Sequence, residues 1–331
     1  MKRSLTVVLI AALLAGAALF PWRPAFAGSC CGGSAAVALV LPKFGQSMID
    51  SSLDMEKYNG FWKKDGTYQR DQPGTDLRQY RLNLGYALRL AKRWQASAAV
   101  PYVWNDNKYS GLSSHTNGPG DTVLSLWYEA FDTTVCRLGW GDIGLSDLVP
   151  AATFGLSLTV PTGVSPYDDV KSSFDITGRG FYRLDANVLL DKTVYPWSAS
   201  VFMSYGKHVE RPVNREYGEY REPYRRNLGD RAVGTLAISY ETFIDSSDSR
   251  NRLTYTGAFS EVWEDEGTLN GDRDPTTGLQ KSSAAGTVAW STLNRSWTIK
   301  LTWNHSINKT GWGSNTVASD IYSLGVTHVY E

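Results

Sequence analysis

The chain has 331 residues and carries 33 basic and 33 acidic side chains, so its formal net charge at pH 7 is zero. This balance argues against a nucleic-acid partner, because phosphate backbones are bound through an excess of Lys and Arg. Aromatic residues are frequent, with 12 Trp and 18 Tyr, and such amphipathic rings are favoured where apolar and aqueous surroundings meet.

The first 27 residues have the three regions of a secretory signal peptide. Basic side chains stand at positions 2 and 3, a mostly apolar stretch covers 5–20, and the sequence Ala-Phe-Ala at 25–27 is a cleavage site of the small-x-small type. We therefore expect residues 1–27 to be removed on export across an inner membrane. Two alternatives stay open, namely a retained N-terminal membrane helix and a lipoprotein anchored at Cys30.

Residues 28–44 are predicted to form a periplasmic tail that contains the sequence Cys-Cys-Gly-Gly. The three cysteines of the chain are Cys30, Cys31 and Cys136. Thiols tend to pair in an oxidising compartment, so one prediction is a disulfide between Cys136 and one of the adjacent pair. The alternative is a redox or metal role for these thiols. No Cys-x-x-Cys-His motif occurs in the chain, so we expect no attached haem and no other cofactor.

From residue 45 onward, apolar and polar residues alternate in segment after segment. Tyr80, Leu82 and Leu84 share one face of such a segment, while Arg81 and Asn83 share the other. This pattern is typical of a strand with a lipid-facing and a water-facing side. The segments are long enough for a tilted transmembrane strand, which needs roughly 9–11 residues. We predict twelve strands, over residues 45–61, 76–90, 94–106, 121–133, 151–162, 179–194, 197–210, 231–244, 252–264, 282–293, 296–308 and 316–330.

The predicted connections alternate between long and short. The clearly long ones cover 63–75, 107–120, 163–178, 211–230 and 265–281, and the short ones cover 91–93, 195–196, 245–251 and 294–295. Outer-membrane barrels combine short periplasmic turns with longer external loops. The connection 134–150 is an exception, because it should be a periplasmic turn but is long, and it contains Cys136. The last strand carries Tyr330 near its end, as an aromatic residue that assembly machinery reads.

These observations predict an all-β fold, a transmembrane antiparallel up-and-down β-barrel of about 12 strands over residues 45–331. Lipid offers no hydrogen bonds, so every strand must be paired and the sheet must close. An even strand number places both termini in the periplasm and the barrel in a bacterial outer membrane.

Three short motifs follow one another inside this pattern. They are Pro101-Tyr102, Gly118-Pro119-Gly120-Asp121 and Val160-Pro161-Thr162-Gly163. In this respect the chain resembles the MetA-pathway of phenol degradation family, outer-membrane transporters distantly similar to FadL-like hydrocarbon channels, over about residues 76–330. The resemblance implies a barrel and the passage of small, aromatic or hydrophobic compounds. The Cys-Cys-Gly-Gly sequence departs from that family and loosely resembles the N-terminal Cys motif of barrels that sheath periplasmic multihaem cytochromes.

Strand parity predicts that a set of charged side chains points into the lumen: Arg81, Glu129, Arg183, Asp185, Glu241 and Lys300. Such charges set the ion selectivity of a pore or pair with one another in a filled interior, and both readings stay open.

The sequence therefore favours a channel or porin-like transporter for small solutes, with a structural barrel that holds a periplasmic electron-transfer partner as the alternative. An enzyme is not expected, because none of the four His belongs to a Ser/His/Asp arrangement. The acidic pair at 272 and 274 lacks the further ligand spacing of a calcium loop, so no metal site is predicted. The expected partners are outer-membrane lipid, lipopolysaccharide beside the charged segment 210–226, and small solutes.

Overall fold

The computed structural model describes residues 39–43, 45–109, 111–130, 136–138, 149–171, 175–246 and 249–331. The predicted signal peptide, Cys30 and Cys31 lie outside the described residues. Cys136 is described by its backbone alone. Within the described ranges, no helix is long and apolar enough to cross a membrane.

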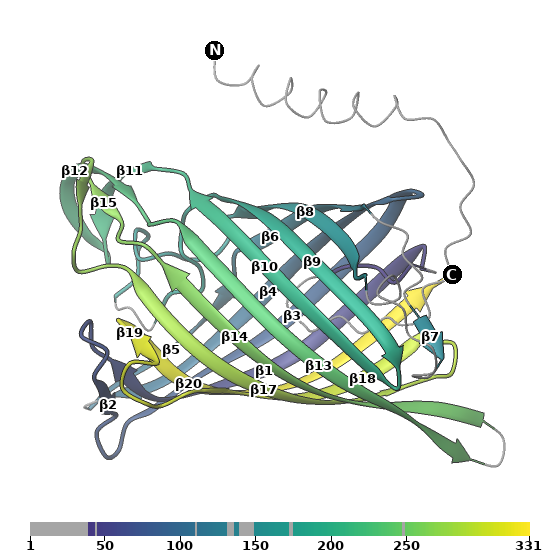
Figure 1. Cartoon of the computed structure of the whole chain (residues 1–331). Coiled ribbons are helices and arrows are strands. Elements are labelled where there is room, and N and C mark those ends of the chain that lie inside the picture. Colours follow the sequence, from purple (N-terminus) through teal and green to yellow (C-terminus); the bar gives the residue numbers. More distant parts are fainter. Residues whose placement is uncertain are drawn as a thin grey trace.

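Twelve long strands form one closed antiparallel sheet (Figure 1). Each pairs with the next, and the last pairs with the first from Ser47 opposite Tyr330 to Trp62 opposite Thr316. This confirms the predicted barrel, because every predicted segment overlaps one of its strands. In order around the barrel they are β1 (Ser47–Trp62), β3 (Asp76–Ala91), β4 (Trp94–Tyr109), β6 (Thr122–Glu129), β8 (Ala151–Val160), β9 (Arg183–Tyr195), β10 (Trp197–His208), β13 (Arg231–Ser246), β14 (Ser249–Glu264), β17 (Leu279–Ser291), β18 (Trp297–Ser306) and β20 (Thr316–Tyr330).

The two ends of the barrel differ in the length of their connections, and we call them the turn end and the loop end. The turn end carries the connections 92–93, 130–150, 196, 247–248 and 292–296, and also the C-terminus (Figure 1). The loop end carries the longer connections 63–75, 110–121, 161–182, 209–230, 265–278 and 307–315. In the exceptional connection 130–150, β7 (Cys136–Leu138) pairs in parallel with the last residues of β9.

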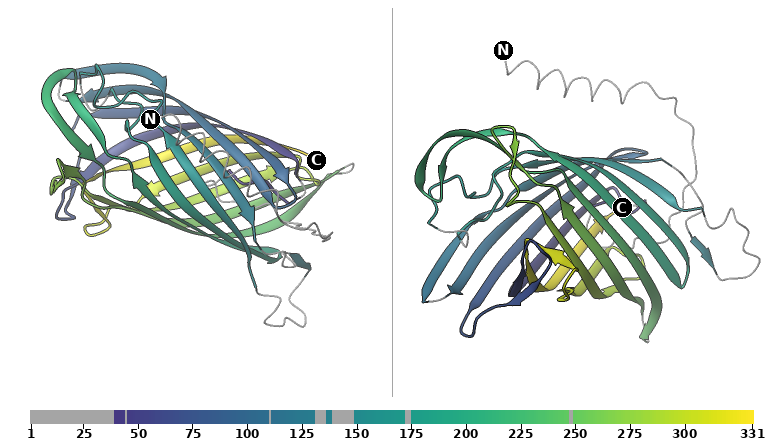
Figure 2. Two further views of the ribbon diagram at one scale, coloured as in Figure 1. Left: turned by 90° about the horizontal axis from the view of Figure 1, so that it is seen from above. Right: turned by 60° about the vertical axis from the view of Figure 1, so that its left-hand side comes forward.

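The loop end contains further short strands. Four of them form a separate four-stranded sheet at this end. They are β11 (Arg211–Glu216), β12 (Glu219–Asn227), β15 (Thr268–Leu269) and β16 (Asp272–Arg273). The others extend barrel strands, namely β2 (Tyr68–Arg70), β5 (Leu112–Pro119) and β19 (Gly313–Ser314). The views in Figure 2 show the barrel strands running obliquely around a common interior, with this second sheet at one end.

The outer face of the barrel is apolar and has an aromatic residue near each end. On β4, Trp94 packs on Tyr128 with ring centroids 4.9 Å apart, and Tyr102 packs on Trp104 at 4.8 Å. The two tryptophans are ten positions apart along the strand. At about 3.3 Å per residue and a tilt of roughly 40°, they lie about 25 Å apart along the barrel axis. That height matches the apolar band of outer-membrane barrels, so lipid covers this face.

Candidate functional site

The six charged side chains predicted to face the lumen lie on the face opposite to the exposed apolar residues, which in a closed barrel is the interior. Each of them forms an ion pair. The pairs are Arg81–Glu56 at 2.6 Å, Glu129–Arg89 at 2.9 Å, Arg183–Asp185 at 2.8 Å, Glu241–Arg252 at 2.6 Å and Lys300–Asp50 at 2.9 Å. Opposite charges thus neutralise one another along the wall, which weakens any fixed field in the interior.

The three sequence motifs meet at the loop end, where Asp121 fastens both ends of the connection 161–182. One carboxylate oxygen of Asp121 accepts a hydrogen bond from the backbone N–H of Gly163 at 3.1 Å, and the other accepts one from the N–H of Arg179 at 2.7 Å. The hydroxyl of Thr162 donates to the carbonyl oxygen of Gly120 at 2.6 Å. Carboxylate acceptors make hydrogen bonds to N–H groups about twice as strong as neutral ones, so Asp121 fixes this loop.

The glycines of the motifs are needed because backbones approach closely at this clamp. A Cβ atom on Gly163 would lie 2.7 Å from Cα of Gly178, and one on Gly178 would lie 2.3 Å from Oδ1 of Asp121. Neither contact is tolerated by a real side chain. Glycine at 163 and 178 therefore lets the two ends of the loop pass close to each other beside Asp121.

The N-terminal segment, residues 39–43 and 45, lies against the interior at the turn end. Arg89 donates Nη2 to the carbonyl oxygen of Pro42 at 3.0 Å and Nε to that of Gly45 at 2.9 Å. The backbone N–H of Leu41 donates to Oε1 of Gln95 at 2.5 Å. Because Gln95 also donates to Glu129 at 3.0 Å, the predicted lumen residue Glu129 belongs to the network that holds this segment.

Apolar side chains line part of the interior beneath that segment. Trp127, Leu189 and Phe202, on β6, β9 and β10, form a buried cluster against which Val40 packs. A Cβ on Gly155 would lie 2.3 Å from the indole of Trp127, so the missing side chain of Gly155 makes room for this ring. The indole N–H of Trp127 is buried and has no hydrogen-bond partner among the residues that the structure describes. The interior therefore combines paired charges with a buried apolar cluster that the N-terminal segment contacts through Val40.

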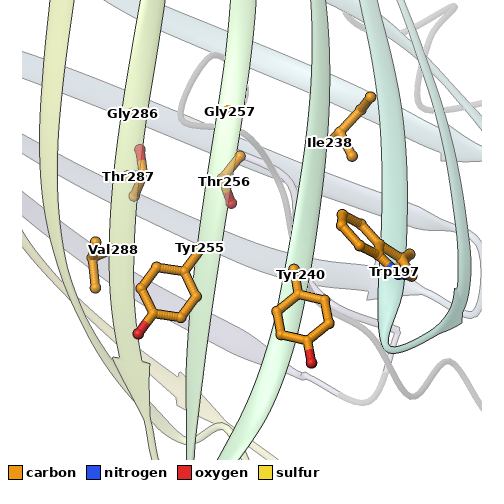
Figure 3. Close-up of a pocket in the computed structure, with 9 residues that line it drawn as sticks. All are labelled: Trp197, Ile238, Tyr240, Tyr255, Thr256, Gly257, Gly286, Thr287 and Val288. Atoms are coloured by element: carbon orange, nitrogen blue, oxygen red, sulfur yellow. The ribbon is translucent and has the colours of Figure 1, made fainter.

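A hollow of about 480 Å³ lies elsewhere, on the outer face of β10, β13, β14 and β17 (Figure 3). Gly257 and Gly286 are paired neighbours at its base, and the large exposed side chains of Trp197, Tyr240 and Tyr255 surround it. The hollow belongs to the apolar outer surface and is not part of the lumen.

Sequence reasoning predicted the wall charges and did not single out the residues that hold the inner segments. Arg89 and Gln95 were not singled out, although both have the parity of the inward face. Asp121 stands in a motif that was recognised, yet its role as a clamp depends on two loop residues that are 42 and 58 positions away. Glu264 ends a predicted strand. Arg179 begins one in the prediction, but β9 starts only at Arg183 and Arg179 lies in the connection before it, so no periodic pattern connects the two.

Comparison with known proteins rests on structure alone. No protein-family model matches the chain, and no curated protein sequence matches it. The barrel is similar to the crystal structure of an outer membrane channel from Pseudomonas putida F1, with a TM-score of 0.63 and 12% identity over 90% of this chain and 100% of that one. The chain has the fold of an outer-membrane β-barrel.

Two further similarities are weaker. The beta domain of the Bordetella autotransporter BrkA gives a TM-score of 0.45 at 9% identity, covering 86% of this chain and 100% of that one. A Pseudomonas aeruginosa FadL homologue gives a TM-score of 0.38 at 8% identity, covering 86% and 91%. At such scores neither adds to the argument.

Proposed function

We propose that the chain is a passive outer-membrane channel for small, neutral solutes with apolar or aromatic parts. The observation that carries this is the interior itself, in which the predicted lumen charges are paired and an apolar cluster around Trp127 lies beside them. Paired charges attract ions weakly, and the aromatic rings of the cluster, against which Val40 packs, favour apolar partners. The similar barrel from Pseudomonas putida F1, described as an outer membrane channel, supports the same function.

The proposal includes an orientation and a family. Short turns face the periplasm in outer-membrane barrels, so the turn end and both termini would lie there, and the loop-end sheet would lie beside lipopolysaccharide. Asp121 joins the second motif to the third through Gly163, and the backbone N–H of Gly120 donates to the carbonyl oxygen of Pro101 at 2.8 Å, which joins the second motif to the first. These contacts support the proposed membership of the MetA-pathway of phenol degradation family.

The experiment uses the purified barrel in proteoliposomes and planar bilayers. We expect swelling in L-arabinose and small, weakly ion-selective conductance steps. Benzyl alcohol, a neutral aromatic, should slow L-arabinose entry by competing for the interior. Glycerol at the same concentration serves as the control and should have little effect.

Absence of both swelling and conductance would contradict a channel. If such a silent barrel also co-purified with a periplasmic electron-transfer protein, the structural alternative would replace it. Equal effects of benzyl alcohol and glycerol would contradict the solute class but leave the channel itself intact.

A further inference from the structure

The connection 161–182 between β8 and β9 contacts two walls of the barrel. Asn105 on β4, which is only 4% exposed, donates Nδ2 to the carbonyl oxygen of Ile176 at 3.0 Å. Arg179 donates Nη1 and Nη2 to the two carboxylate oxygens of Glu264 on β14 at 2.6 and 2.7 Å. In the order β4-β6-β8-β9-β10-β13-β14, β14 is the sixth strand after β4 in a closed ring of twelve. The two contacts therefore lie on opposite walls.

The Arg179 side chain, and not the backbone, completes this crossing. Ile176 and Arg179 are three positions apart, so the backbone between them spans at most about 10 Å. Asp121, between β5 and β6, binds the backbone N–H of Arg179 at 2.7 Å, which holds the backbone on the near side. From this backbone the Arg179 guanidinium extends to Glu264, and its two parallel hydrogen bonds fix its direction as well as its position.

The two side chains of the Arg179–Glu264 ion pair differ in exposure. The side chain of Glu264 is 5% exposed, whereas that of Arg179 is 37% exposed. Arg231 also approaches Glu264, at 3.5 Å, but it comes from the neighbouring wall strand β13. Glu264 is thus bound by one cation from the wall and by one that crosses the interior, and only the crossing cation obstructs the path along the barrel.

We propose that Arg179 is a specificity-determining residue, a crossbar at the loop end that limits the cross-section of solutes able to enter. This inference rests on the proposed channel function. Its consequence is selection by size and not only by charge. Monosaccharide-sized neutral solutes pass beside the bar, and disaccharide-sized ones are excluded while the Arg179–Glu264 bridge is in place.

The test compares the full-length barrel with Arg179→Ala and Arg231→Ala in proteoliposomes, using the neutral sugars L-arabinose and sucrose. Both variants remove a cation from Glu264, so they are matched in charge. Heat-modifiable mobility on a gel establishes that each variant is a folded barrel. We expect Arg179→Ala to raise the ratio of the sucrose rate to the L-arabinose rate by about threefold or more, as for a widened pore, while Arg231→Ala keeps the wild-type ratio.

Each outcome decides the question. If the wild type admits L-arabinose and Arg179→Ala leaves the ratio unchanged, or changes it no more than Arg231→Ala does, the crossbar is refuted and the channel stands. If neither the wild type nor Arg179→Ala admits L-arabinose, both proposals fail. If only Arg179→Ala admits it, the wild type is not the proposed channel and selection by size is refuted, because Arg179 then closes the barrel completely.

Discussion

At the scale of single residues, the interior depends on where side chains are missing as much as on where they stand. Trp127 is 2% exposed in the lumen because Gly155, on the adjacent strand β8, leaves space for its indole ring. A glycine within a strand weakens that strand unless close approach requires it. Here the close approach is that of an aromatic ring, and the glycine shapes the interior surface.

Gly155→Ala should therefore destabilise the barrel. The added Cβ would lie 2.3 Å from the ring of Trp127, and overpacking of this kind typically costs about 1–3 kcal/mol. The free energy of unfolding, measured by urea titration in lipid vesicles, checks this. Gly234→Ala is the matched control, because a Cβ at Gly234 meets nothing within 4 Å. Equal stability of the two variants would contradict the packing argument.

Asp274 stabilises the loop-end sheet in a pH-dependent manner. Hydrogen bonds from the side chain and backbone N–H of Thr276, at 2.6 and 3.0 Å, hold the pKa of the Asp274 carboxyl below its ordinary value of 3.8. A lowered folded-state pKa means that the carboxylate stabilises the fold above the unfolded-state value. That contribution is lost as the pH falls below 3.8 through the folded-state pKa.

Asp274→Asn should increase hydrogen exchange in the segment 267–278 at pH 6. The difference from the wild type should shrink as the pH falls below the ordinary value of 3.8, because the wild-type carboxyl then becomes protonated as well. Taking the ratio of variant to wild type at each pH cancels the intrinsic pH dependence of exchange. A ratio that stays constant down to pH 2 (about two units below a normal carboxyl) would speak against this role of Asp274.

At the scale of elements, the inward-folded loop 161–182 depends on the Asp121 clamp. Asp121→Ala removes both acceptors and should cost about 1–3 kcal/mol of loop stability for each charged hydrogen bond lost. Asp121→Asn keeps one acceptor and should have a smaller effect. Hydrogen exchange over residues 175–182 should accelerate while exchange in the barrel strands does not change. The control is Asp76→Ala, which removes an exposed carboxylate that pairs only with Arg78 within the described residues.

The sequence was sufficient to predict the strands of the barrel, but it did not predict the contacts made inside the barrel. Alternation along Tyr80–Leu90 is a local property, because lipid selects apolar side chains at every second position. The closure of β20 on β1 followed from the requirement that no edge remains unpaired. The contact of Arg179 with Glu264 joins residues 85 positions apart through an irregular loop, and no local rule encodes it.

The N-terminal segment illustrates the same limit. Residues 28–44 were predicted to be a periplasmic tail, and nothing in the sequence around Leu41 suggested a binding site for it. In the structure, Leu41 packs in a cluster with Met48, Ala87 and Val329. These inward apolar positions looked like ordinary members of an alternating strand, because a partner from outside the sheet leaves no periodic signature.

At the scale of the whole molecule, the cysteines are predicted to join the N-terminal segment to the connection 130–150. The backbone of β7, which begins at Cys136, lies beside Thr193 at the turn end, and residues 39–45 lie at the same end. Wild-type protein should therefore migrate faster without reductant than with it on a denaturing gel. The variant with Ser at positions 30, 31 and 136 should show no such difference. Identical migration of the wild type under both conditions would exclude the disulfide.

The orientation of the barrel can be tested in the cysteine-free background with single reporter cysteines. Tyr220, at the tip of the loop-end sheet, is 73% exposed, whereas Lys92 lies in the tight turn between β3 and β4. Because short turns face the periplasm, a membrane-impermeant maleimide should label Tyr220→Cys on intact cells and label Lys92→Cys only after the outer membrane is opened. The reverse pattern would invert the barrel. It would place the Arg179 crossbar at the periplasmic mouth, where it would act on solutes as they leave.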